Sequence, residues 1–98
     1  MTEYSFAPDD QPIEFPVEDF IDLHTFLPKE VPSLLKEYLI ECAKADILEV
    51  RIIHGKGKGI LREKVHAFLR KSPLVESYQL AEQDRGSWGA TIVRLRRL

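Results

Sequence analysis

A glycine-rich turn between two apolar stretches constrains the fold of this chain more than any other feature. Residues 48–53 are rich in β-branched side chains, which favours a short buried strand, and the glycines that follow His54 end it. From Leu61 onward, apolar residues recur at helical spacing as far as Lys71, and Pro73 cannot continue a helix. The sequence therefore predicts a strand, a glycine turn and a helix, in that order.

The glycine turn has the composition of an anion-binding loop. Gly55, Gly57 and Gly59 let the backbone approach another group closely and present successive N–H donors to it. The following helix adds unpaired N–H groups and partial positive charge. Full positive charges come from three side chains of the same stretch: Lys56, Lys58 and Arg62. We predict a phosphate site here, although a flexible basic turn between two core elements explains the glycines and lysines equally well.

The other periodic segments complete an α/β chain. Residues 20–24 alternate as a short strand, and helical spacing from residue 28 or 30 to about residue 44 predicts the first helix. Further strands are expected over residues 75–81 and 90–95, separated by a loop rich in turn formers. The first helix and the strands on either side of it form a β-α-β unit, which implies parallel neighbours and a right-handed crossover, and the short last loop favours an antiparallel final pair. We predict an α/β sandwich in β-α-β-α-β-β order, with a four-stranded mixed sheet and two helices.

Charge is segregated along the chain. The formal net charge of the 98 residues is −2, but residues 1–23 carry seven Asp and Glu and no Lys or Arg, whereas residues 24–98 hold all 14 Lys and Arg against nine Asp and Glu. We therefore expect an acidic, proline-containing arm over residues 1–17 and one small basic domain over residues 18–98. One hypothesis places the carboxylates of the arm near the basic loop, where they compete with phosphate.

Cysteine usage and hydropathy exclude several protein classes. Cys42 is the only cysteine, so the chain has no internal disulfide and no cysteine cluster for a metal. No segment has the length and hydropathy of a membrane span, and the acidic N-terminal residues do not resemble a signal peptide. We expect a cytoplasmic protein with no membrane partner. The oligomeric state is not indicated by the sequence.

Asp22 and His24 are the candidate catalytic pair. Alternation along the first strand places both side chains on one side, where the carboxylate can fix the tautomer of the ring or raise its basicity. The alternative is an edge strand whose polar face is only solvated. His54 follows the neighbouring parallel strand, and an unperturbed imidazole titrates near neutral pH. Since open α/β sheets bind ligands at the carboxyl ends of their strands, we expect both imidazoles to flank one phosphodiester.

Three separated motifs resemble those of the small MutS-related (Smr) domain family. They are Ile21-Asp22-Leu23-His24, His54-Gly55-Lys56-Gly57-Lys58-Gly59-Ile60-Leu61-Arg62 and Gly86-Ser87-Trp88-Gly89-Ala90-Thr91-Ile92-Val93. The family patterns are L-D-L-H-G, H-G-x-G-x-G-x-L-R and G-x-x-G-x-T, and the resemblance covers roughly residues 17–96. It implies a fold similar to the C-terminal domain of bacterial translation initiation factor 3. It also implies nucleic-acid binding and, in several members, metal-independent or metal-stimulated endonuclease activity on DNA or RNA.

The resemblance implies roles for individual residues. Asp22 and His24 match the D-x-H pair that is tied to cleavage. The residues that match the binding loop and the third motif are His54, Gly55, Gly57, Gly59, Gly89 and Thr91. Two positions depart from the family patterns: Thr25 replaces the glycine after the first histidine, and Ser87-Trp88 replace smaller residues.

The remaining candidates each have two interpretations. Trp88 can stack on an exposed base or cover the end of the sheet. Arg85 can contact phosphate from the third loop or be only solvated. His66 lies in the second helix, off its apolar face, and is interpreted as a surface histidine.

These residues lead to three functional hypotheses. In the first, the domain is an endonuclease: on RNA one imidazole takes the 2′-hydroxyl proton and the other protonates the leaving oxygen, while Lys56 and Lys58 stabilise negative charge. No cofactor is required, with Mg²⁺ or Mn²⁺ as an optional addition. In the second, the same surface binds RNA, DNA or a ribosomal surface without catalysis, which Thr25 favours. In the third, the acidic arm makes the chain a protein-interaction adaptor.

Overall fold

The secondary-structure elements follow one another in the predicted order. The computed structural model describes residues 17–57, 59–81 and 89–98. They form β1 (Phe20–Asp22), a short 3₁₀ helix η1 (Pro28–Glu30), α1 (Val31–Lys44), β2 (Glu49–Ile53), α2 (Ile60–Lys71), β3 (Val75–Leu80) and β4 (Ala90–Leu95). This confirms the β-α-β-α-β-β prediction. The predicted acidic arm lies outside the described residues except for Val17.

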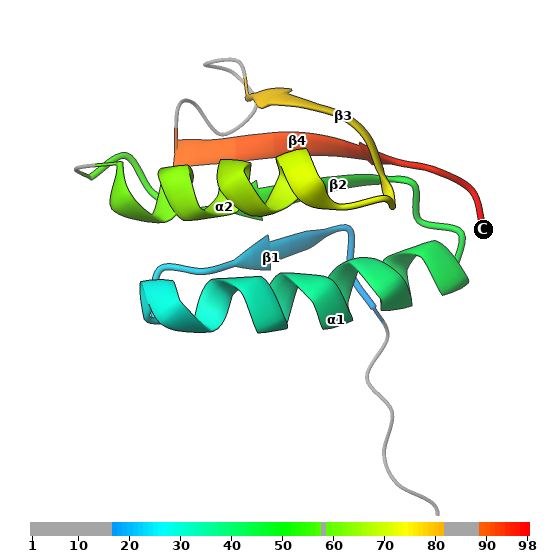
Figure 1. Cartoon of the computed structure of the whole chain (residues 1–98), viewed down its shortest axis with the longest axis horizontal. Coiled ribbons are helices and arrows are strands. Elements are labelled where there is room, and N and C mark those ends of the chain that lie inside the picture. The colour runs from blue at the N-terminus through cyan, green and yellow to red at the C-terminus, as the bar shows by residue number, and fades with distance from the viewer. Residues whose placement is uncertain (1–16, 58, 82–88) are drawn as a thin grey trace, which may run out of the picture.

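The four strands form one mixed sheet in the order β1-β2-β4-β3. β1 is parallel to β2, whereas β4 is antiparallel to both β2 and β3. β2 and β3 therefore run in the same direction, and α2 connects them across β4. Figure 1 shows α1 beside β1 and α2 in front of β2 and β4. Because both crossovers advance in the same direction across the sheet and share one handedness, both helices cover the same face, where they contact one another.

One hydrophobic core lies between the helices and the sheet. Its fully buried members include Leu35, Leu39, Cys42, Val50, Ile52, Val65, Leu69, Val93 and Leu95. Burying one such aliphatic side chain contributes about 1.5 to 3 kcal/mol relative to leaving it exposed. The core therefore fixes the strand ends relative to one another. Among the described residues, no helix is long and apolar enough to cross a membrane.

The first strand is two residues shorter than the sequence predicts. β1 ends at Asp22, and residues 24–26 form a turn in which the Phe26 N–H donates to the Leu23 carbonyl oxygen at 2.9 Å. Alternation in the sequence extends to His24, so it does not reveal where strand pairing stops. The consequence is that His24 lies in a turn directly after the strand and not within the sheet.

Candidate active site and nucleic-acid interface

The carboxyl ends of β1 and β2 bring the first two sequence motifs together. The strands are parallel neighbours, with Asp22 opposite Ile53. The next hydrogen bond joins the Leu23 N–H to the Ile53 carbonyl oxygen at 2.8 Å. His24 and His54 follow immediately, at the edge of the sheet where open α/β folds bind ligands.

Asp22 holds the imidazole of His24 in one orientation. Oδ1 of Asp22 accepts two hydrogen bonds from His24, one from Nδ1 at 2.7 Å and one from the backbone N–H at 3.0 Å. These hydrogen bonds, the one from the side chain first, lower the pKa of Asp22. Because the ionised carboxylate can only accept, Nδ1 carries a proton, and in the neutral ring Nε2 keeps a lone pair. The predicted proximity of the two side chains is confirmed, and Nε2 is left as the proton acceptor.

Both members of this pair are accessible to a large substrate. The side chain of His24 is 68% exposed and that of Asp22 is 44% exposed. An exposed imidazole with a fixed tautomer can reach a phosphodiester on the surface of a folded nucleic acid without any prior opening of the domain.

His54 lies differently from the sequence prediction. The residue is 4% exposed, its Nδ1 lies 2.9 Å from the Gly55 carbonyl oxygen, and its Nε2 lies 2.9 Å from Oγ1 of Thr91. Leu23, which directly follows β1 and lies beside His54, is fully buried, so this pair of positions faces the helices. The expectation that His24 and His54 flank one phosphodiester is therefore wrong, because both ring nitrogens of His54 are occupied inside the protein.

A hydrogen-bonded chain explains the position of His54. Nε2 of His66 also lies 2.9 Å from Oγ1 of Thr91, so the threonine hydroxyl joins two imidazoles. The Gly55 carbonyl can only accept, so His54 carries its proton on Nδ1 and accepts at Nε2 from the Thr91 hydroxyl. Since that hydroxyl has one hydrogen, it accepts the Nε2–H of His66 in turn. Burial lowers the pKa of both histidines, which favours the neutral rings that this chain requires.

His66 and Thr91 therefore have roles that the sequence did not reveal. His66 is partly buried, and its ring packs on Tyr78 of β3 with the ring centroids 5.0 Å apart. Its interpretation as a surface histidine is wrong. Thr91 is fully buried, so it cannot contact a nucleic acid as expected and instead positions the two histidines. Only the strand order, which places β4 beside β2 and under α2, could have indicated this.

The glycine loop is fastened to the start of β4. The Gly89 carbonyl oxygen accepts the N–H groups of both His54 and Gly55, each at 2.8 Å. Gly55 and Gly59 have φ values of +85°, in the left-handed region that favours glycine. Gly89 is buried and holds the loop through its backbone. The second and third motifs are thereby joined into one structural unit.

The loop and the N-terminus of α2 enclose a hollow of about 240 Å³ that is suited to an anion. Gly59 is the N-cap of α2 and supplies no side-chain cap, so the first helical turn offers its N–H groups to a ligand. The guanidinium of Arg62 folds back over Gly59, since a Cβ at position 59 would lie 2.7 Å from Nη2. Lys56 is exposed on the same loop. The N-terminus of α2 and Arg62 thus border one hollow, and Lys56 lies on the adjoining loop.

Several candidate residues lie in the parts of the chain that the structure does not describe. These are Lys58, Arg85, Ser87 and Trp88. Their roles stay predictions.

The donor set gives little support to a metal site. Within residues 17–57, 59–81 and 89–98, no three His, Cys, Asp or Glu side chains gather in a group that could hold a metal ion. At the sheet edge, Asp22 already accepts from His24, and His54 faces the helices. The described side chains at this sheet edge therefore do not form a metal site.

Gly59→Ala tests the loop geometry. We expect it to lower the free energy of unfolding by about 1 to 2 kcal/mol, because an L-residue is strained at this φ and its Cβ would displace Arg62. Gly57→Ala is the matched control, since its φ is not left-handed and nothing lies within 4 Å of its added Cβ. Urea denaturation measures both variants. Equal losses for the two would contradict the described loop.

The comparison with known proteins agrees with this geometry. Residues 21–96 match the family model of the Smr domain. This chain is a member of the Smr domain family. Among curated proteins, Endonuclease MutS2 of Thermomicrobium roseum is 41% identical over 92 residues, which is 93% of this chain and 12% of that protein. Endonuclease MutS2 of Clostridium tetani is 40% identical over 80 residues, or 82% of this chain and 10% of that protein.

Solved structures of Smr domains share the fold. The Smr domain of Thermus thermophilus MutS2 is 32% identical, with a TM-score of 0.76, over 81% of this chain and 99% of that one. YdaL, a stand-alone small MutS-related protein from Escherichia coli, is 26% identical with a TM-score of 0.76, over 86% of this chain and 69% of that one. The chain thus matches almost the full length of the solved MutS2 Smr domain but spans only about a tenth of the length of the MutS2 proteins.

Proposed function

We propose that this Smr domain binds RNA or DNA at the glycine loop and cleaves a phosphodiester bond with the Asp22–His24 pair. The observation that carries the proposal is the exposed His24 ring, held by Asp22 Oδ1 at 2.7 Å, at the same sheet edge as the basic loop. A site that only binds an anion would be weakened by a neighbouring carboxylate, because the two negative charges repel. MutS2 relatives that bear the name endonuclease, at about 40% identity, support the same conclusion.

Binding relies on the phosphate backbone. The N–H groups of the first turn of α2, with Lys56 and Arg62, receive one phosphate. Ile60 is 57% exposed next to this hollow and offers an apolar contact to a sugar or base. In the third motif, Arg85 and Trp88 remain candidates for a further phosphate contact and for base stacking.

Cleavage uses one imidazole as the general base. On RNA, Nε2 of His24 takes the 2′-hydroxyl proton as the 2′-oxygen bonds to phosphorus, and Asp22 stabilises the resulting imidazolium. The bond from phosphorus to the 5′-oxygen breaks, and this oxygen takes a proton from water, leaving a cyclic phosphate. The N–H groups at the start of α2 and Lys56 stabilise the added negative charge. On DNA, water replaces the 2′-hydroxyl as the nucleophile. His54 takes no part in proton transfer and positions the loop.

The direct test is a cleavage assay of the purified chain. Structured RNA and supercoiled DNA are incubated with the protein in EDTA, in Mg²⁺ and in Mn²⁺. We expect cleavage of at least one substrate, with activity in EDTA if no cofactor is required. Failure to cut either substrate under all three conditions would end the enzymatic proposal.

A non-catalytic binding module is the second candidate. Thr25, where the family pattern has glycine, lies in the turn directly after His24, so the departure falls at the catalytic pair itself. In this case the domain binds RNA, DNA or a ribosomal surface and cuts neither nucleic acid.

Replacement of the loop lysines tests binding separately from cleavage. Lys56→Ala with Lys58→Ala should weaken the affinity for nucleic acid and flatten its dependence on salt. For duplex DNA, each lost phosphate contact reduces the slope of log binding constant against log salt concentration by about 0.9. Lys29→Ala with Lys44→Ala removes the same charge from exposed positions on η1 and α1 and is the control. Fluorescence anisotropy over a range of salt concentrations measures both. If the control pair reduces the salt dependence of the affinity by the same amount, the effect comes from net charge and not from the loop.

A further inference from the structure

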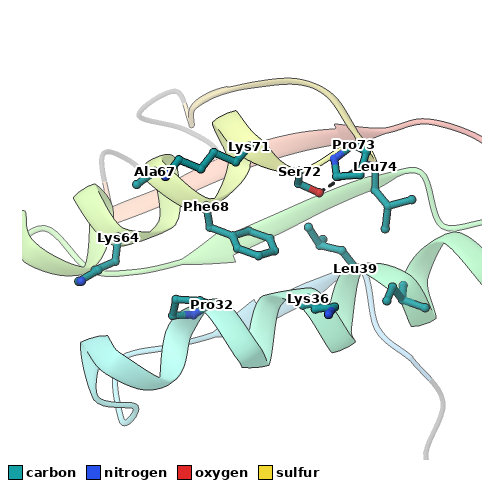
Figure 2. A pocket seen from close by; sticks show the side chains of 11 residues that line it. Pro32, Lys36, Leu39, Lys64, Ala67, Phe68, Lys71, Ser72, Pro73 and Leu74 are labelled. Atoms are coloured by element: carbon teal, nitrogen blue, oxygen red, sulfur yellow. Dashed lines mark hydrogen bonds between the residues drawn. The ribbon is translucent and has the colours of Figure 1, made fainter.

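A second concave site lies between the two helices, separate from the proposed nucleic-acid interface. It is a groove of about 570 Å³ formed by α1, α2 and the residues after α2. The groove and the hollow at the glycine loop share no lining residue. Figure 2 shows Phe68 of α2 pointing into the space between the helices, with Leu39 of α1 and Leu74 nearby. The floor of this groove is therefore apolar.

Three lysines surround the apolar floor. Lys36 comes from α1, and Lys64 and Lys71 come from α2 (Figure 2). All three residues are exposed, and no Asp or Glu lines the groove. Its volume is in the range of about 300 to 1,000 Å³ that is usual for ligand sites. An apolar floor with a cationic rim fits a peptide that carries both apolar and acidic side chains.

The chain itself contains such a peptide before β1. Residues 1–16 carry four carboxylates and no Lys or Arg, so their charge opposes that of the three lysines. Their large apolar side chains include Phe6, Ile13 and Phe15. Prolines at positions 8, 12 and 16 disfavour a helix and favour extended backbone. The composition of this segment therefore complements the groove in charge and in hydropathy.

The point at which this segment joins the domain permits docking within one molecule. Glu18 is held on α1, where its carbonyl oxygen accepts from the Tyr38 hydroxyl at 2.6 Å, and Val17 lies near Leu34 on the same flank. The groove lies on the other flank of α1. A helix with its side chains is about 10 to 12 Å across, whereas 16 extended residues span up to about 53 Å. A tether of this length also gives a high effective concentration at the groove.

We propose that residues 1–16 cross α1 and dock in the groove, with apolar side chains on Phe68 and carboxylates near Lys36, Lys64 and Lys71. In this proposal the acidic arm binds on the side of the domain that carries the two helices. It replaces the hypothesis that the arm competes with phosphate at the glycine loop.

Nuclear magnetic resonance of the full 98-residue chain tests this proposal. The first variant combines Phe6→Ser, Ile13→Ser and Phe15→Ser. We expect its backbone amide shifts to change at Lys36, Ile40, Lys64, Phe68 and Lys71 and to stay unchanged over residues 55–57. Thr2→Ser with Gln11→Ser alters the same segment without removing an apolar side chain and should leave the groove unchanged.

A charge exchange tests the lysine rim. Lys64→Glu with Lys71→Glu should shift the amides of Ile40 and Phe68 in the direction seen with the first variant. Adding Asp9→Lys and Asp10→Lys should restore them. Lys29→Glu, on η1 outside the groove, is the control and should have no such effect.

Three outcomes would overturn the proposal. If the amide chemical shifts of the groove residues are the same in the first variant and in the parent chain, the arm is not docked there. Shifts confined to the glycine loop would place the arm at the phosphate site. If the amide chemical shifts of the groove residues depend on protein concentration, a second copy of the chain is the occupant.

Discussion

We expect His24→Ala to abolish the proposed cleavage and to leave the affinity for nucleic acid within about twofold. Proton transfer by one positioned side chain accounts for about 10²- to 10⁴-fold in rate, and no other described imidazole is both exposed and held by a carboxylate. His24 lies in the turn after β1 and not in the hollow at the N-terminus of α2. The substitution therefore removes the base and spares the phosphate contacts. Cleavage rates under single-turnover conditions, with affinity from anisotropy, separate the two quantities.

Asp22→Asn is the companion variant to His24→Ala. The amide keeps the shape of the side chain and an oxygen that can accept from Nδ1, but it loses the charge that stabilises the imidazolium. We expect a smaller loss of rate than for His24→Ala, again at unchanged affinity. A parallel loss of binding and cleavage in His24→Ala would instead make this residue a binding group. Unchanged cleavage would mean that another group carries the proton.

We expect Thr91→Val to lower the free energy of unfolding by about 2 to 4 kcal/mol. Valine has nearly the same shape, so the loss comes from the hydroxyl alone. Its removal leaves Nε2 of His54 and Nε2–H of His66 without their partner in the core, and each unsatisfied buried group costs about 1 to 3 kcal/mol. Because His54 also holds the Gly55 carbonyl, we further expect weaker binding of nucleic acid. Urea denaturation and anisotropy measure the two effects.

Two controls isolate the contribution of the Thr91 hydroxyl. Thr91→Ser retains the hydroxyl and loses only a methyl group, so most of the stability should return. Thr25→Val makes the same chemical change at an exposed position in the turn after β1, where a surface substitution usually stays within about 0.5 kcal/mol. If Thr91→Val unfolds at the same urea concentration as the parent chain, the hydrogen-bonded chain of histidines does not contribute to stability.

The elements and the first motif could be predicted from local sequence pattern. Helical spacing in the second helix ends before Pro73, and the β-branched residues of the second strand end at the glycine turn, so the order of these elements follows from neighbours along the chain. Asp22 and His24 lie only two residues apart, so their contact is local, although it is made by the turn after β1 and not by strand alternation. The charge of the loop is likewise a local property.

The roles of His54, His66 and Thr91 could not be predicted in this way. His54 and Thr91 are separated by 37 residues and His66 and Thr91 by 25, so their contacts depend on which strands are neighbours. The sequence indicates two parallel strands but not that β4 lies between β2 and β3. Without that order, His54 resembles a surface residue at a strand end, and His66 resembles a solvated residue on a helix.

The reversed direction of β4 has a consequence for how this domain is made. Because β4 runs against β2, its first residues and not its last ones lie at the functional edge, where the Gly89 carbonyl fastens His54 and Gly55. A growing polypeptide that has emerged only as far as β3 contains every glycine and lysine of the loop but not its anchor. The proposed phosphate site is thus complete only when the final strand has been synthesised and inserted.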